Sequence, residues 1–173
     1  MTKEPNQWES EGKRAYAAGK YSEAAQAFRE AARAYTLGRD ELHAAEMNNN
    51  LSVSLLKAGQ FQEAHAAALD TDKTFESAGD KNKQAMSLGN QAAALEELKR
   101  HEEALALYDR AAALFAESGN GDMRALVLKS AAAIRLKQGK LNDTAMDMLG
   151  SLGAVEKPTL FQRFLKFLLR FKP

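Results

Sequence analysis

The side chains best suited to acid–base or metal chemistry are three histidines and two pairs of adjacent glutamates, namely His43, His65, His101, Glu96-Glu97 and Glu102-Glu103. An imidazole can transfer a proton near neutral pH or bind a metal ion, and two carboxylates can share the roles of general acid and general base. The histidines fall in three different predicted helices or turns, and neighbouring glutamates on a helix diverge by about 100°. We therefore expect the glutamates to be solvated, and His101 to pack in the position that Tyr21 and Phe61 hold in the first two repeats, rather than a catalytic group.

Other sequence signatures of catalysis are missing. The 173 residues include no Cys, which excludes disulfides and thiolate metal sites. No glycine-rich phosphate loop, nucleophile elbow or metal-ligand spacing occurs in the sequence. The sequence therefore predicts a protein that is not an enzyme and that uses no metal and no cofactor.

A short motif recurs four times at a spacing of 40 residues. It begins at Gly19, Gly59, Lys99 and Gly139, and its first copy reads Gly-Lys-Tyr-Ser-Glu-Ala. A fixed period of this length is typical of stacked supersecondary units, none of which can bury its apolar face alone. The chain should therefore be a helical solenoid that offers a surface to a partner.

Aligning the four copies predicts eight helices in four pairs, and so an all-α fold. The first helices of the pairs are expected near 5–18, 40–58, 80–98 and 121–138, and the second helices near 21–37, 61–77, 101–118 and 141–150. No proline lies between Pro5 and Pro158, so long helices are possible throughout that stretch.

The turns between the helices have explicit signals. Glycines able to adopt the left-handed conformation that ends a helix are Gly19, Gly59 and Gly139 after the first helices, and Gly38, Gly79 and Gly119 after the second ones. Side chains that can accept a hydrogen bond at the next helix N-terminus are Asp40, Asp80 and Asn120 or Asp122.

The residues around these turns resemble the tetratricopeptide repeat. Its pattern W-x2-L-G-x2-Y, followed by A-x3-F, is approached by Trp8-x2-Glu11-Gly12-x2-Ala15 and met by Ala24-x3-Phe28. Small residues recur wherever the helices of a pair should touch: Gly12, Ser52, Ala92 and Ala132 in the first helices, and Ala24, Ala64, Ala104 and Thr144 in the second ones. The resemblance covers about residues 5–151 and is weakest in the fourth repeat.

This resemblance implies a right-handed α-α superhelix of about four helix pairs. The period of 40 is longer than the usual 34 and looks like the longer-helix subclass found in cell-polarity adaptors, kinesin light chains and vesicle-fusion attachment proteins. The implied domain organisation is a repeat array over 1–151, divided near 5–38, 39–78, 79–119 and 120–151, then a linker over 152–158 and a basic amphipathic helix over 159–173.

In this family the first helices line a concave groove, and the resemblance implies a protein-binding scaffold or adaptor that captures a peptide or helix there. The corresponding groove residues are Lys13, Tyr16, Asn49, Asn50, Val53, Met86, Asn90, Ala93, Lys129 and Ala133. Asn50 and Asn90 are equivalent, and a carboxamide can bond a peptide N–H and C=O together. Alternatively, these amides cap or bridge helices within the array.

The C-terminal segment has a charge and an apolar pattern of its own. Five of the 24 lysines and arginines, but one of the 23 acidic residues, lie after residue 155, which leaves −3 on residues 1–155 and +4 on the tail. At about 100° per residue, a wide apolar arc and a narrow cationic face share one helix. Its candidate contact residues are Phe161, Phe164, Leu165, Phe167, Leu168 and Phe171, with Arg163, Lys166 and Arg170.

Three uses of this tail helix are open from the sequence. It could cap the exposed flank of the fourth repeat, lie on an anionic membrane surface, or mediate a homo-oligomer by entering another protomer's groove. The second use gives an alternative function, a peripheral membrane or vesicle-associated assembly factor. The acidic body is a poor match for nucleic acid, which is therefore not an expected partner.

The sequence also predicts a location. Met1 to Trp8 is polar, which does not resemble a secretory signal, and no apolar run approaches the roughly 20 residues needed to cross a bilayer. We expect a cytoplasmic protein, with a peripheral membrane location if the tail binds lipid.

Overall fold

The computed structural model describes residues 3–139 and residue 150, and all of its elements in that part are α-helices. Their bounds are α1 Pro5–Ala17, α2 Tyr21–Leu37, α3 Glu41–Lys57, α4 Phe61–Ala68, α5 Thr71–Ser77, α6 Lys81–Glu97, α7 His101–Glu117 and α8 Gly121–Lys137. The predicted all-α class is confirmed. The linker, the amphipathic tail and all but residue 150 of the helix predicted over 141–150 lie outside the described residues.

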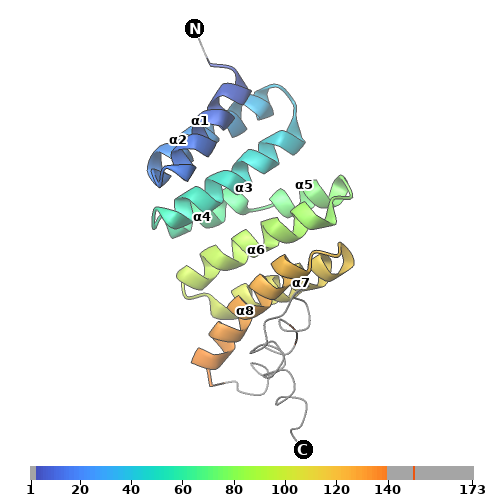
Figure 1. Cartoon of the computed structure of the whole chain (residues 1–173). Helices are drawn as coiled ribbons and strands as arrows, with labels where there is room; N and C mark the ends of the chain where they lie inside the picture. The colour runs from blue at the N-terminus through green and yellow to red at the C-terminus, as the bar shows by residue number, and fades with distance from the viewer. Residues whose placement is uncertain (1–2, 140–149, 151–173) are drawn as a thin grey trace, which may run out of the picture.

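The helices stack in chain order, from α1 and α2 at the N-terminal end to α7 and α8 at the other (Figure 1). Each packs mainly against its neighbours along the chain, and α6 also contacts α3 and α4. We call the meeting of α1, α2 and α3 the first junction, that of α3, α4, α5 and α6 the second, and that of α6, α7 and α8 the third. Beyond α8, Gly150 lies against Leu128, where an added Cβ would come within 3.2 Å of its Cδ1 atom.

The predicted contact positions within the pairs are buried wherever the structure describes them, and Thr144 lies outside the described residues. Ala24, Ala64 and Ala104 have no exposed surface. A Cβ at Gly12 would lie 2.8 Å from two ring atoms of Phe28, so the two helices approach too closely there for a larger residue. At the equivalent place in the next pair, Ser52 is buried and donates a hydrogen bond of 2.8 Å to the Ala64 carbonyl.

Helix N-termini follow the 40-residue period. Asp40, Asp80 and Asn120 accept hydrogen bonds from the backbone N–H groups three residues ahead. This agrees with the prediction for Asp40 and Asp80. For the last helix the sequence left Asn120 or Asp122 open, and Asn120 is the cap.

The turns agree with the prediction except at Gly38. Gly19, Gly59, Gly79, Gly119 and Gly139 have the expected left-handed φ angles. The prediction for Gly38 is wrong, because its φ is −77° and Arg39 takes the left-handed position at 60°. Arg39, not Gly38, lies 40 residues before Gly79. At the turn that corresponds to Gly19, Lys99 has a φ of 64°.

The single helix predicted over 61–77 is broken. Leu69 has an extended ψ of 135° and Asp70 a left-handed φ of 63°, so α4 ends at Ala68 and α5 begins at Thr71. The Thr71 hydroxyl donates to the Ala68 carbonyl at 2.8 Å, and this bond provides a partner for a backbone oxygen near the end of α4. The neighbouring side chains Thr71 and Asp72 are both buried, and their polar partners come from helices on either side.

Candidate functional site

A cavity of about 240 Å³ opens at the first junction between α1 and α3. Its walls are Lys13 and Tyr16 of α1 and Asn50 and Val53 of α3, and Phe28 of α2 lies at its base. Four of the predicted groove residues therefore line one cavity. In the sequence Phe28 was identified only as part of the A-x3-F match, and that motif is the signal that could have placed it in the cavity lining.

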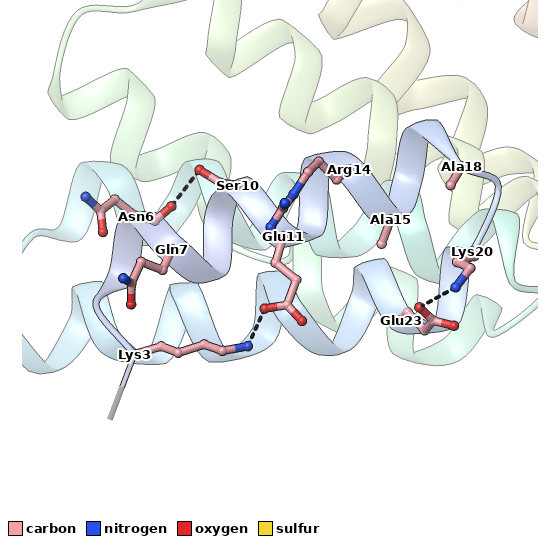
Figure 2. A pocket seen from close by; sticks show the side chains of 10 residues that line it. All are labelled: Lys3, Asn6, Gln7, Ser10, Glu11, Arg14, Ala15, Ala18, Lys20 and Glu23. Carbon is pink, nitrogen blue, oxygen red and sulfur yellow. Dashed lines mark hydrogen bonds and ion pairs between the residues drawn. The ribbon is translucent and has the colours of Figure 1, made fainter. Parts of the chain in front are cut away.

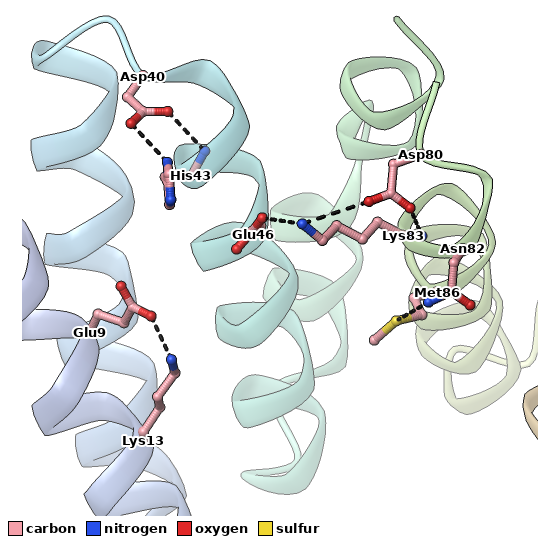
Figure 3. Close-up of polar contacts among 9 residues, drawn as sticks. All are labelled: Glu9, Lys13, Asp40, His43, Glu46, Asp80, Asn82, Lys83 and Met86. Carbon is pink, nitrogen blue, oxygen red and sulfur yellow. Dashed lines mark hydrogen bonds and ion pairs between the residues drawn. The ribbon is translucent and has the colours of Figure 1, made fainter. Parts of the chain in front are cut away.

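The charged wall of this cavity is fixed by contacts within the first helix pair. Lys13 donates to Glu9 at 2.5 Å, as Figure 3 shows, and the Tyr35 hydroxyl donates to the other Glu9 oxygen at 3.1 Å. The hydrogen bond from Lys13 is the main cause of a lowered Glu9 pKa, while burial and the Glu9 contact raise the pKa of Tyr35. The Lys13 charge is thus compensated, and the cavity offers apolar surface, one carboxamide and no net charge.

The two equivalent asparagines have free side-chain amides. Among residues 3–139 and 150, no hydrogen bond uses the side chain of Asn50 or of Asn90, and both side chains are half-buried. The alternative that these amides cap or bridge helices therefore has no support in the described part of the chain. Each retains two donors and an acceptor for a ligand.

Asn49 behaves differently from its neighbour. It is buried, and its side-chain oxygen lies 3.2 Å from the Thr71 hydroxyl oxygen, whose single proton is shared between this contact and the Ala68 carbonyl. Adjacent helical residues point about 100° apart, so Asn50 faces the cavity while Asn49 faces the second junction. The structure places Asn49 inside the array rather than on the groove surface.

The remaining predicted groove residues lie outside this cavity. Met86, Lys129 and Ala133 are exposed, and Ala93 is half-buried. At the third junction Tyr108 takes the place of Phe28. Its buried hydroxyl donates to Glu96 at 3.0 Å, and burial raises its pKa.

A row of polar contacts crosses the first helices of successive pairs (Figure 3). Asp40 bonds His43 at 2.8 Å, and this contact raises the pKa of His43. Lys83 of α6 reaches Glu46 of α3 at 2.5 Å, which ties the second pair to the third. Sequence reasoning did not identify this row. Asp40 and Asp80 are 40 residues apart and each contacts the residue three positions ahead, a recurrence that the 40-residue alignment could have found.

A second, larger hollow lies on the N-terminal flank of the stack (Figure 2). It encloses about 1160 Å³, is open to solvent, and is lined by Lys3, Asn6, Gln7, Ser10, Glu11, Arg14, Ala15, Ala18, Lys20 and Glu23. Lys3 pairs with Glu11 and Lys20 with Glu23. Exposed pairs of this kind have little binding energy to offer, and the smaller cavity at the first junction is the better candidate site.

Two kinds of site are not found in the described part of the chain. No group of three or more acidic or histidine side chains there could hold a metal ion. None of the described helices combines the length and the apolarity needed to span a bilayer.

Comparison with protein families identified none whose model matches the chain, and no curated protein matched it either.

Proposed function

We propose that this chain is a non-catalytic adaptor of the tetratricopeptide type, which binds an extended peptide or a helix in the groove formed by α1, α3, α6 and α8. The observation that carries the proposal is the pair of equivalent amides, Asn50 and Asn90, without partners among the described residues. Fully buried polar groups are normally paired within the protein, whereas these half-buried amides keep their donors and acceptors available to solvent or to a ligand.

The cavity at the first junction supports the same function. Tyr16, Phe28 and Val53 give it apolar walls, and Asn50 stands at its side. An apolar side chain of a peptide could enter the cavity while the peptide backbone bonds the amide. The compensated charge of Lys13 favours an uncharged anchor residue over a carboxylate.

A library of random 12-residue peptides displayed on phage would test this proposal. We expect the intact chain to enrich a family of sequences, with affinities near the micromolar range, or about 8 kcal/mol. Replacing Asn50→Ala and Asn90→Ala together should abolish binding of the enriched peptides and leave the urea midpoint nearly unchanged.

The neighbouring asparagine supplies the matched control. Asn49→Ala removes an amide that bonds Thr71, so it should lower the free energy of unfolding by about 1–3 kcal/mol. At a urea concentration where the variant is folded, it should still bind the enriched peptides. Unchanged binding of the enriched peptides by the variant with both Asn50→Ala and Asn90→Ala would contradict the proposed site.

A further inference from the structure

The buried polar side chains of the described residues are concentrated at one junction. All eight of them fall between Asn49 and Gln91, on α3, α5 and α6: Asn49, Ser52, Ser54, Thr71, Asp72, Gln84, Ser87 and Gln91. The second junction is therefore unlike the other two in the chemistry of its interior.

Residues 40 positions apart are equivalent, so the interiors of the three junctions can be compared residue by residue. Thr71 and Asp72 on α5 correspond to Ala31 and Ala32 at the first junction and to Ala111 and Ala112 at the third, and all six residues are buried. Ser87 and Gln91 on α6 correspond to Met47 and Leu51 at the first junction and to Val127 and Ala131 at the third. The same backbone positions hold apolar contacts at two junctions and hydrogen bonds at the second.

These polar residues form a chain of contacts across the second junction. The Thr71 hydroxyl bonds Asn49 at 3.2 Å and also contacts the Ser87 hydroxyl, so α5 links α3 to α6. Further along α6, Gln91 donates to Asp72 at 3.0 Å, and Lys83 reaches Glu46. Lys83, Ser87 and Gln91 are spaced by four residues, so they lie along one face of α6.

The apolar core is divided at the same place. One cluster runs through α2, α3 and α4, with α1 side chains packed against it, and the other through α6, α7 and α8. Ala94 is the one buried α6 residue that belongs to the first cluster. The break at Leu69 and Asp70 lies between the clusters, so the helix that crosses the second junction is itself interrupted.

This arrangement has a physical consequence for opening. Separating two apolar surfaces in water costs free energy in proportion to area, whereas hydrogen bonds broken at an opened junction can be replaced by bonds to water. In a solenoid, the coupling between units comes only from contacts with the neighbouring unit. The second junction should therefore couple its neighbours more weakly than the first and third do.

We propose that the second junction is a hinge that divides the array into two cooperative units, α1 to α4 and α6 to α8, which move and unfold separately. The inference stands on the second junction itself and not on the proposed groove function. Asn50 lies on the first unit and Asn90 on the second, so the hinge sets the span between the two free amides.

A coupling experiment on the full chain tests the proposal. Trp8 is the one tryptophan of the sequence and packs against the first cluster, so its fluorescence reports the first unit, while far-ultraviolet circular dichroism reports both. Phe115→Ala, with Ile134→Val as a milder variant, destabilises the second unit. In these variants we expect part of the dichroism signal to be lost at a lower urea concentration than in the native chain, while the urea midpoint of Trp8 fluorescence stays unchanged. A Trp8 midpoint that falls together with the dichroism would overturn the proposal.

A matched variant gives the second junction the residues of the third. It combines Thr71→Ala, Asp72→Ala, Ser87→Val and Gln91→Ala, which are the residues of the third junction at those positions. Asn49→Ala is added because it removes the partner that Thr71 leaves unpaired. In this background, Phe115→Ala should shift the Trp8 and dichroism midpoints together. Thr36→Val serves as the control, because it removes a threonine hydroxyl bonded within α2 and should not change the coupling. If the variant with the replaced second junction does not fold, the effect of Phe115→Ala on the Trp8 midpoint in the native background still decides the proposal.

Distance measurement tests the hinge motion independently, and the absence of Cys makes site-directed labelling clean. Spin labels at Arg33→Cys and Ala113→Cys lie on different units, whereas labels at Ala113→Cys and Lys137→Cys lie on one. We expect a broader distance distribution for the first pair, and a narrower one in the exchanged background. Equal widths for both pairs in the native junction would contradict the hinge.

Discussion

The first and third junctions use equivalent residues to opposite effect. At the first, Phe28 lies below Tyr16 and Asn50, and a cavity of about 240 Å³ remains open. At the third, Tyr108 occupies the same position, and its hydroxyl bonds Glu96, the residue equivalent to Tyr16, while Ser130, the equivalent of Asn50, stands within its reach. The Tyr108 hydroxyl, together with its partners Glu96 and Ser130, thus distinguishes a position that the array fills itself from one that a ligand can use.

The largest expected effect comes from removing the ring at the first junction. Phe28 is almost fully buried and lies against Gly12, so Phe28→Ala should lower the free energy of unfolding by about 3–5 kcal/mol. Urea unfolding followed by Trp8 fluorescence measures this loss. Leu37→Ala, at a side chain that is 77% exposed, should change it by less than about 0.5 kcal/mol. Equal losses in both variants would disprove the packing described for Phe28.

Exchanging the hydroxyl group should have a smaller and asymmetric effect. Tyr108→Phe loses a hydrogen bond to a carboxylate, so we expect it to cost about 1–3 kcal/mol. Phe28→Tyr should change stability by less than that and should weaken binding of peptides selected on the native chain, because Phe28 lines the cavity and the equivalent Tyr108 directs its hydroxyl to the residues that correspond to Tyr16 and Asn50. Urea midpoints and peptide titration measure the two effects. A Tyr108→Phe variant as stable as the native chain would show that the Glu96 contact contributes nothing.

The turns of the first and third repeats offer a gain in stability. Gly19 and Lys99 both adopt a left-handed φ, which costs a residue with a side chain about 1 kcal/mol more than it costs glycine. Lys99→Gly should therefore stabilise the chain by about 0.5–1 kcal/mol, measured as a raised urea midpoint. Lys20→Gly, at a residue with a φ of −86°, should give no gain. A lower midpoint for Lys99→Gly would contradict the strain argument.

The smallest expected effect is a pH dependence of stability, which the helix cap at the first junction should show and the cap at the third should not. The first has Asp40 with His43, and the third has Asn120 with Met123, which do not titrate. Asp40 raises the pKa of His43, so the folded state holds that proton more tightly. The resulting stability is fully present below the ordinary pKa of about 6.5 and is lost as pH rises through the folded value.

Both side chains are about half exposed, so solvent screening keeps the contribution small. We expect the melting temperature of the native chain to exceed that of His43→Gln slightly at mildly acid pH and to converge with it above neutrality. Proton NMR should place the titration midpoint of His43 above that of His65, whose pKa is lowered mainly by burial. A reversed order would contradict the assignment of the Asp40 contact.

The sequence predicted the elements that depend on local chemistry. Helix starts at Asp40 and Asp80 followed from side-chain acceptors, and the pairing followed from buried small residues such as Ala64 and Ala104. The resemblance, transferred through the register of the 40-residue period, named Lys13, Tyr16, Asn50 and Val53, which line one cavity. A periodic pattern predicts which residues share a face, because that depends only on helical geometry.

The failures occurred where packing decided the conformation. The break between α4 and α5 has no glycine or proline to mark it. Its local signal is Asp70, a residue type that tolerates a left-handed φ and favours helix N-caps, and the break also depends on buried partners for Thr71 and Asp72. Arg39 and Lys99 take left-handed positions because the stacking of helices requires a tight turn. Asn49 was predicted to lie in the groove beside Asn50. A shift of one helical position moves a side chain from the cavity to the second junction, where Asn49 contacts Thr71.

The pairing of each helix with its chain neighbours also has a consequence for how the chain folds. The side-chain hydrogen bonds and ion pairs of the described residues join positions no more than 38 apart, so few long loops must close before native contacts form. Almost every buried residue of the first cluster precedes residue 65. We expect this half to fold during synthesis, before α8 has left the ribosome, and its completed surface to become the template on which α6 docks.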